Sequence, residues 1–335
     1  MPPREDSGLK ISGRSAICVL NRSLTLFLLL GVSVLHSYAG SDTVVLYPGY
    51  GDSRGAIIEG RVIESESIKP VKATDSKWRN FIRNLRLLFN DEREERKVTV
   101  HAAGGEWTTV TDEEGYLKVA VDLAQPLPPG WQTVTAQAGD GSAEGRLLIV
   151  PPENTLGIIS DIDDTILVSD VTDKDMLLVN SFLKNPLQRE AVPGVADYYR
   201  RLAERNPRPN AAPVIYLSAS PRQFQSSIQA FLDFNDFPSG VLITKKITND
   251  RTSEPLLNQI RYKTEKIEEI LARLPRVRFV LVGDDGEKDP EIYHDIRMRF
   301  PARVEAVWIR RVHPDPARAV FPEQGDLGKA LARAK

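Results

Sequence analysis

Three acidic residues follow one apolar-leaning stretch of the sequence. Residues 157–160 lead directly into Asp161, Asp163 and Asp164. Because side chains alternate along a strand, Asp161 and Asp163 start on the same side, close enough to share one substrate and one cation. Two ionised neighbours repel each other, and a cation on one acid with a proton on the other relieves that repulsion. The spacing therefore predicts a carboxylate that attacks beside a carboxyl group that transfers protons.

This acidic cluster has two alternative explanations. A calcium-binding loop between two helices requires Gly at its sixth position, which Ile166 occupies here. A solvated acidic turn is the simpler explanation, but its place directly after a buried strand argues against it.

Further candidate residues follow predicted strands downstream. Hydroxyl groups after the strand at 214–217 could hold a phosphate oxygen, a lysine opens a predicted helix, and a second acidic strand end follows residues 278–282. Single residues of these kinds are nearly always structural or solvated, so their order along the chain carries the weight. They are Ser218 and Ser220, then Lys263, then Asp284, Asp285 and Asp289.

The elements expected to position these residues are buried strands alternating with helices. This pattern is an α/β signature, and nearly continuous apolar strands are typical of a parallel sheet covered on both faces. Ligands bind at the carboxyl ends of the strands in such sheets. We predict strands at 156–160, 214–217, 241–243, 278–282 and 304–309, and helices at 195–204, 224–235, 263–273 and 291–299.

The preceding residues predict a separate β domain. Short alternating runs between Thr43 and Val150 are separated by turn residues, and residues 112–115 join two runs as a hairpin would. That regularity predicts a small β-sandwich. Its strands are expected at 44–47, 56–63, 98–100, 107–110, 116–121, 132–136 and 146–150.

One segment of this region is predicted to be helical. Apolar residues from Trp78 to Phe89 recur at spacings of three and four, and the opposite face is basic. Such a helix could make peripheral contact with an anionic membrane. The alternative is a helix packed on its own sandwich, because most amphipathic stripes are core.

The N-terminal residues predict export. Basic residues precede a run of twelve residues from Leu24 to Leu35, which has the length of a signal-peptide core and is short for a membrane span. Ser37 and Ala39 have the spacing of a cleavage site, so we expect a periplasmic or secreted protein. An uncleaved anchor, or a cytoplasmic protein with a mistaken start codon, is the alternative.

Composition excludes several protein classes. With 41% hydrophobic and 27% charged residues, the chain is neither disordered nor a multi-pass membrane protein. A formal charge of -2 gives no general attraction for nucleic acid, so we expect no such partner.

The order of the motifs resembles the haloacid dehalogenase superfamily. Asp161-x-Asp163-x-Thr165 is similar to its first motif, and Ser218, Lys263 and residues 283–285 follow in the order of the other three. More narrowly, residues 162–166, 218–221, 283–287 and 289–293 resemble the actin-patch type of phosphatidate phosphatase, related to the lipins. That resemblance covers residues 156–312, and residues 47–51 with the strands that follow resemble the leader domain of bacterial members.

The resemblance implies a Rossmann-like, doubly wound parallel sheet and a Mg²⁺-dependent mechanism. Asp161 would attack phosphorus to form an aspartyl-phosphate, while Asp163 would protonate the leaving oxygen and then activate water. Asp161, the Asp163 carbonyl and Asp284 would bind the metal, and Ser218 and Lys263 would hold the phosphoryl group. The residues implied to contact substrate or to support this site are Thr165, Ser220, Arg222, Asp285 and Asp289, with Lys245 or Lys246 as alternatives to Lys263.

Arg222 departs from the eukaryotic pattern, in which an aromatic residue follows Ser-x-Ser-Pro. Its planar fork could pair with a second phosphate or carboxylate of the substrate, or Arg222 could be an exposed helix-start residue. We expect hydrolysis of phosphatidate to diacylglycerol. A phosphatase of soluble esters and a non-catalytic phosphatidate-binding module are the alternatives.

Four segments follow from these patterns. We expect a signal peptide over 1–39, a β-sandwich leader domain over 43–150, a phosphatase catalytic domain over 155–313 and a C-terminal tail over 314–335.

Overall fold

The computed structural model describes residues 41–64, 94–102, 104–122, 127–168, 189–246, 258–313 and 315–333. They belong to the second of two units, Ser41–Lys335, and the first unit is Met1–Gly40. The predicted signal peptide and the predicted helix between Trp78 and Phe89 lie outside the described residues. Among the helices that are described, none has both the length and the apolar character needed to cross a membrane.

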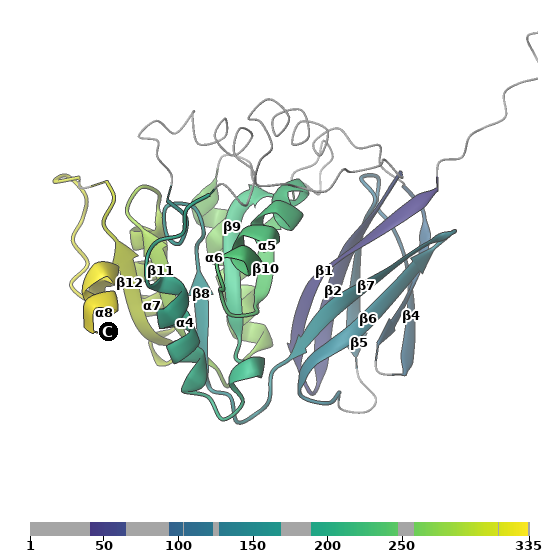
Figure 1. The fold of residues 1–335 in the computed structure, drawn as a ribbon, viewed down its shortest axis with the longest axis horizontal. Coiled ribbons are helices and arrows are strands. Elements are labelled where there is room, and N and C mark those ends of the chain that lie inside the picture. Colours follow the sequence, from purple (N-terminus) through teal and green to yellow (C-terminus); the bar gives the residue numbers. More distant parts are fainter. Residues whose placement is uncertain are drawn as a thin grey trace, which may run out of the picture. The chain divides into compact units, whose positions relative to one another are not determined.

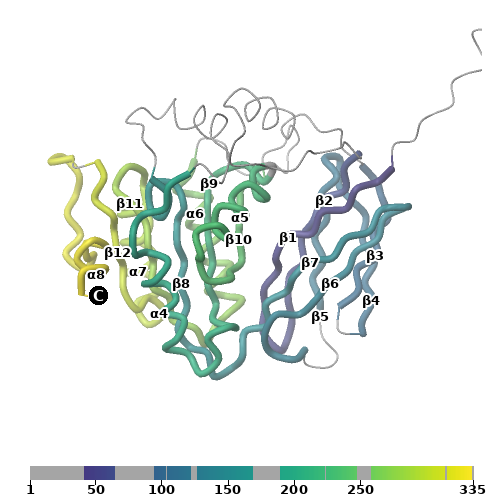
Figure 2. Tube along the Cα trace, in the orientation of Figure 1, coloured from purple at the N-terminus to yellow at the C-terminus, as the bar shows by residue number. Residues whose placement is uncertain are grey.

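Seven strands form the first sheet (Figures 1 and 2). Their order is β4-β3-β6-β7-β1-β2-β5, with every pairing antiparallel except that of β1 with β7. Alternating apolar residues such as Val98, Val100 and Val134 are buried in its core. The strands are β1 (Asp42–Asp52), β2 (Gly55–Glu64), β3 (Lys97–Ala102), β4 (Gly105–Val110), β5 (Tyr116–Asp122), β6 (Gly130–Ala138) and β7 (Gly141–Ile149).

All seven strands expected in this region are present, and hydrogen bonds join them in the continuous order given above. The packing of a β-sandwich stays a prediction. The expected hairpin at 112–115 is wrong, because β4 pairs with β3 and β5 pairs with β2, at opposite edges of the sheet. The turn crosses between these edges: the Thr111 N–H donates to the Arg96 carbonyl, and the Val62 N–H donates to the Gly115 carbonyl. Alternating apolar and polar residues on both sides of a turn are found in a hairpin and also where a turn joins two strands that do not pair. The sequence pattern therefore does not distinguish these two connections.

Six parallel strands form the second sheet, in the order β10-β9-β8-β11-β12-β13. The expected mixed α/β fold with a parallel sheet is confirmed. The chain runs from β8 to β9 on one side and returns to β11 on the other, and ligands bind at the carboxyl ends of strands where the order reverses in this way. The strands are β8 (Leu156–Ser160), β9 (Val214–Pro221), β10 (Val241–Lys245), β11 (Arg278–Asp284), β12 (Val304–Arg310) and β13 (Gln324–Asp326).

Helices cover both faces of this parallel sheet (Figure 1). One apolar cluster includes Tyr199 of α4, Phe231 of α5 and Leu327 of α8, and the other includes Ile267 of α6 and Ile296 of α7. Strands buried from both sides need apolar residues at every position, which explains their continuous apolar runs. The α-helices are α4 (Val195–Glu204), α5 (Gln225–Phe234), α6 (Gln259–Arg273), α7 (Asp289–Arg299) and α8 (Leu327–Arg333), and the short 3₁₀ helices are η2 (Pro209–Ala211), η3 (Arg222–Phe224) and η4 (Pro301–Arg303).

The C-terminal residues extend the parallel sheet. β13 pairs with β12, and Leu327 of α8 is buried in the core. Both elements fall within residues 314–335, for which the sequence predicted only a tail. Gln324, Gly325 and Asp326 contain no apolar side chain, so periodicity could not identify β13 as a strand.

Candidate active site

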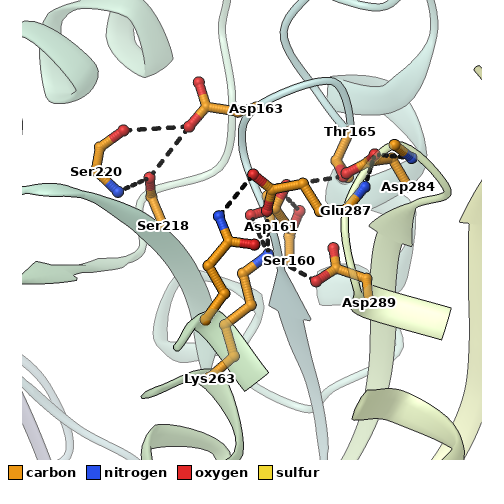
Figure 3. Close-up of polar contacts among 12 residues, drawn as sticks. Ser160, Asp161, Asp163, Thr165, Ser218, Ser220, Lys263, Asp284, Glu287 and Asp289 are labelled. Atoms are coloured by element: carbon orange, nitrogen blue, oxygen red, sulfur yellow. Dashed lines mark hydrogen bonds and ion pairs between the residues drawn. The ribbon is translucent and has the colours of Figure 1, made fainter. Parts of the chain in front are cut away.

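Asp161 is the first residue after β8 and is buried at the carboxyl edge of the parallel sheet (Figure 3). Its N–H donates to the Val282 carbonyl of β11 at 2.9 Å. The Thr165 hydroxyl donates to its Oδ2 at 3.0 Å, and Lys263 Nζ donates to its Oδ1 at 2.9 Å. Both carboxylate oxygens are therefore held in place by side chains from different parts of the chain.

Lys263 of α6 is surrounded by carboxylates. Its Nζ lies 2.9 Å from Asp161, 2.6 Å from Asp289 and 3.2 Å from Glu287. Burial by itself lowers the pKa of Lys263, but the three carboxylates outweigh burial and raise the pKa above its ordinary value. Lys263 is therefore a cation in contact with three acidic side chains.

Asp161, Asp284 and Asp289 form an acidic cluster, with one oxygen of each within 4.8 Å of the others. Burial is the main cause that raises the pKa of Asp161, and it also raises the pKa of Asp284 to about 8 and that of Asp289 to about 7. Gly283 allows this close approach, because a Cβ there would lie 2.4 Å from Asp289 Oδ2.

The donor set of this acidic cluster fits a hard divalent cation. Asp289 Oδ2 is buried without a hydrogen-bond partner. An orphaned carboxylate oxygen among mutually repelling acids is the kind of group that Mg²⁺ satisfies, since Mg²⁺ prefers oxygen ligands. The predicted ligands Asp161 and Asp284 belong to this cluster, while Asp289 contributes a third carboxylate that the sequence assigned to a supporting role.

Asp163 faces other partners than Asp161. Its Oδ2 accepts hydrogen bonds from Ser218 Oγ at 3.3 Å and Ser220 Oγ at 3.2 Å (Figure 3). The next residue, Asp164, has a φ of 56°, in the left-handed region that ends the extended backbone. Burial, followed by the charge of Glu287, raises the pKa of Asp163. This acid is therefore biased toward its protonated form, close to Asp161 in sequence but in different surroundings.

Asp285 and Arg222 make their contacts outside the acidic cluster. Asp285 Oδ1 accepts hydrogen bonds from the N–H groups of Val312 at 2.6 Å and His313 at 2.7 Å, after the end of β12. Arg222 Nη2 lies 2.5 Å from Glu59 Oε2 of β2, and its side chain is only 7% exposed. Arg222 therefore pairs with a carboxylate of its own chain, and the alternative of an exposed helix-start residue is wrong.

The structure also separates the three candidate lysines. Lys263 is the one in contact with Asp161. Lys245 Nζ lies 5.2 Å from the centre of the Tyr262 ring, and Lys246 Nζ lies 2.6 Å from Asp112 Oδ2 in the first sheet. The geometry favours Lys263 for contact with a phosphoryl group on Asp161.

Glu287 is a member of this site to which sequence reasoning gave no role. It lies 3.2 Å from Lys263 and accepts a hydrogen bond from Gln259 Nε2 at 2.9 Å. Its position directly after Asp284-Asp285-Gly286 was the available signal, but a fourth acid beside one lysine is not predictable without the fold.

Residues 156–311 match the family model described as Phosphatidate phosphatase APP1, catalytic domain. Over these residues, the chain is similar to an APP1-type catalytic domain. This match confirms the predicted family resemblance, and the matched residues include Asp161, Asp163, Lys263 and Asp284.

Two relatives share parts of this chain. Phosphatidate phosphatase APP1 of Saccharomyces cerevisiae is 33% identical over 158 residues, which cover 46% of this chain and 26% of the yeast protein. An uncharacterized protein of Schizosaccharomyces pombe is 28% identical over 244 residues, which cover 69% of this chain and 38% of that protein. The alignments thus span well under half of the length of either relative.

One solved structure with partial similarity is the HAD domain of effector protein Lem4 from Legionella pneumophila. It covers 55% of this chain and 95% of its own, with a TM-score of 0.32 and 14% sequence identity. A likeness this low supports no conclusion, so the APP1-type assignment rests on the sequence match.

Proposed function

We propose that this chain is a Mg²⁺-dependent phosphomonoesterase that hydrolyses phosphatidate to diacylglycerol and phosphate through an aspartyl-phosphate on Asp161. The observation that carries the proposal is the burial of Asp161 within the acidic cluster and beside Lys263, with Asp163 held by two serine hydroxyls. The match to the catalytic domain of a phosphatidate phosphatase family supports the lipid substrate.

In the first step, a carboxylate oxygen of Asp161 bonds to phosphorus while the bond from phosphorus to the ester oxygen breaks. Thr165 and Lys263 hold that carboxylate, which reduces the entropy lost on reaching the reactive geometry. The proton of Asp163 passes to the ester oxygen, which leaves as the hydroxyl of diacylglycerol. The raised pKa of Asp163 supports this role, because a general acid must be protonated near neutral pH.

In the second step, the Asp163 carboxylate takes a proton from water while the water oxygen bonds to phosphorus. The bond between phosphorus and Asp161 breaks, which releases inorganic phosphate and restores the carboxylate. Hydrogen bonds from Ser218 and Ser220 orient Asp163 in both steps. Because these serines lie in the last part of β9, the strand next to β8, the sheet places their hydroxyls beside Asp163.

Asp161, Asp284 and Asp289 would hold Mg²⁺. When bound, the ion supplies positive charge that neutralises the phosphoryl oxygens. Lys263 adds a second positive charge beside Asp161. Asp284 is oriented for this task by the N–H groups of Gly286 at 2.6 Å and Glu287 at 3.3 Å, which both donate to its Oδ1.

Phosphate release from phosphatidate in mixed micelles tests the proposal, with soluble phosphate esters as competing substrates. We expect release that requires Mg²⁺, stops with EDTA and falls by at least about 10³-fold in Asp161→Asn. Asp236→Asn is the control for the same change of side chain, since Asp236 is exposed and its φ of 56° is one that Asn tolerates.

Other outcomes separate the alternatives. Turnover of soluble esters alone would keep the mechanism and remove the lipid substrate. Binding of phosphatidate without release from any substrate would replace the enzyme by a binding module.

Two further proposals rest on the N-terminal sequence. We propose that the protein is exported by its N-terminal segment, and that the segment from Trp78 to Phe89 contacts a membrane. Mass spectrometry of the mature N-terminus tests the first, and vesicle binding of a Trp78→Ala variant tests the second.

A further inference from the structure

The last residue of β11 and the turn after it carry two groups of the active site. Asp284 belongs to the acidic cluster, and Glu287 contacts Lys263. The N–H groups of Gly286 and Glu287 point inward to Asp284 Oδ1. The shape of this turn therefore determines where the Asp284 carboxylate lies.

Arg318 holds the same turn from the outside. Its Nη1 donates to the Asp285 carbonyl, and its Nη2 donates to the Glu287 carbonyl at 2.8 Å. Its Nε lies 3.4 Å from Glu291 Oε1 at the start of α7, and its side chain is 15% exposed. One guanidinium thus joins two carbonyls of the turn to the helix that follows it.

A second tie links the turn to the same C-terminal segment. Asp285 Oδ1 accepts from the N–H groups of Val312 and His313, six and five residues before Arg318. The segment between β12 and β13, yellow in Figure 1, begins at the carboxyl edge of the sheet, where β11 also ends. The turn is therefore held between the interior of the site and a segment that follows the APP1-type match, which ends at residue 311.

We propose that Arg318 is a positioning residue that sets the affinity of the acidic cluster for Mg²⁺. This inference rests on the proposed function for its metal. Arg318 contacts none of the three clustered carboxylates, and it acts through the two carbonyls that it anchors. With those carbonyls fixed, the N–H groups of Gly286 and Glu287 stay aimed at Asp284, and its carboxylate is oriented before the ion arrives.

The chemistry of arginine fits this role. Its planar guanidinium presents several donors in a fixed fork, so it can hold two carbonyls and a carboxylate at once. A lysine has a single ammonium on a flexible stem and cannot reproduce the fork. Removal of a group that orients metal ligands typically lowers metal affinity by about 10–100-fold.

Isothermal titration of the metal-free, full-length protein with Mg²⁺ alone tests the inference. We expect the affinity to fall by about 10–100-fold in Arg318→Gln and by a similar amount in Arg318→Lys. Arg299→Gln is the matched control, because Arg299 pairs with Asp295 and Glu268 on the exposed surface of α7 and should leave the affinity unchanged. Thermal unfolding of each metal-free variant shows whether it is folded.

Arg318→Lys keeps the positive charge but loses the planar set of donors, so it distinguishes the effect of the guanidinium geometry from the effect of charge alone. Folded Arg318 variants that bind Mg²⁺ as tightly as wild type would overturn the inference, and so would a wild-type protein that binds no Mg²⁺. A wild type that binds Mg²⁺ but releases no phosphate would remove the proposed function and leave the inference standing. Phosphate release at saturating Mg²⁺ should recover most of its wild-type rate in Arg318→Gln, since the reacting groups are intact.

Discussion

The buried acidic cluster should make the metal-free protein less stable as pH rises. Burial raises the pKa of Asp284 from 3.8 to about 8 and that of Asp289 from 3.8 to about 7. Because the pKa of each acid is higher in the folded than in the unfolded state, the folded protein binds more protons at pH values between the two. The stability that those protons provide is complete below about pH 4 and is lost as pH rises to about 8.

The size of this effect follows from the shift of Asp284. A shift from 3.8 to about 8 corresponds to on the order of 5 kcal/mol, since one pKa unit corresponds to about 1.4 kcal/mol. Relaxation and water entry reduce that figure, so we expect a loss of at least about 2 kcal/mol between pH 5 and pH 8, or roughly 5 °C in Tm. Mg²⁺ competes with the protons, so it should stabilise the protein most at high pH.

Thermal unfolding from pH 5 to pH 9, in EDTA and in Mg²⁺, measures both trends. Asp284→Asn removes one titrating carboxyl group, so its Tm in EDTA should fall less steeply with pH than that of wild type. Subtracting the Tm of Asp284→Asn from that of wild type at each pH removes the contribution of the other titrating groups, which the two proteins share. A wild-type Tm in EDTA that stays level or rises over this range, or an equal slope in Asp284→Asn, would refute the reasoning.

Three other variants probe separate parts of the structure. Asp163→Asn should lose about 10²–10⁴-fold in the rate of phosphate release but keep its Mg²⁺ affinity by calorimetry, because its carboxylate lies with Ser218 and Ser220; a large loss of affinity would contradict this. Lys263→Met leaves three carboxylates without their cation, so the free energy of unfolding of the metal-free protein, measured with urea, should fall by about 3–5 kcal/mol at pH 8 and by less at pH 5. An equal fall at the two pH values would contradict this explanation. A double-mutant cycle of Glu59→Gln and Arg222→Met should give a coupling of about 1–3 kcal/mol in urea unfolding, and a coupling near zero would show that this ion pair does not join the two sheets.

The parallel sheet was readable from sequence because its physics is local. Strands β8 and β11 are buried on both faces, so their apolar runs marked them, and each acidic strand end followed directly. Helices α4, α5, α6 and α7 matched the predictions to within four residues at each end. What failed depended on pairing between distant segments: the path after β4 and the addition of β13 to the edge of the parallel sheet.

The candidate site shows the same division between local and distant causes. The motif order brought Asp161, Lys263 and Asp284 together as predicted from resemblance. Arg222 could not be placed from sequence, because its partner Glu59 lies 163 residues away. Glu287 and Arg318 were missed for a related reason, since an acid in a turn and an arginine near the C-terminus look like ordinary surface residues.

The two acids at the end of β8 differ in role because their surroundings differ, although only one residue separates them. Alternation along a strand predicted that they start on one side and share a cation. The extended backbone ends at Asp164, whose carbonyl accepts a hydrogen bond from Arg310 Nη1 at 2.5 Å, and the turn is closed by Ile166 N–H on the Ile162 carbonyl. Asp161 is thereby paired with a lysine, and Asp163 with two hydroxyls. A hydroxyl stabilises a carboxylate far less than a contacting cation does, so Lys263 favours the ionised, attacking form of Asp161, and the hydroxyls around Asp163 fit it for proton transfer.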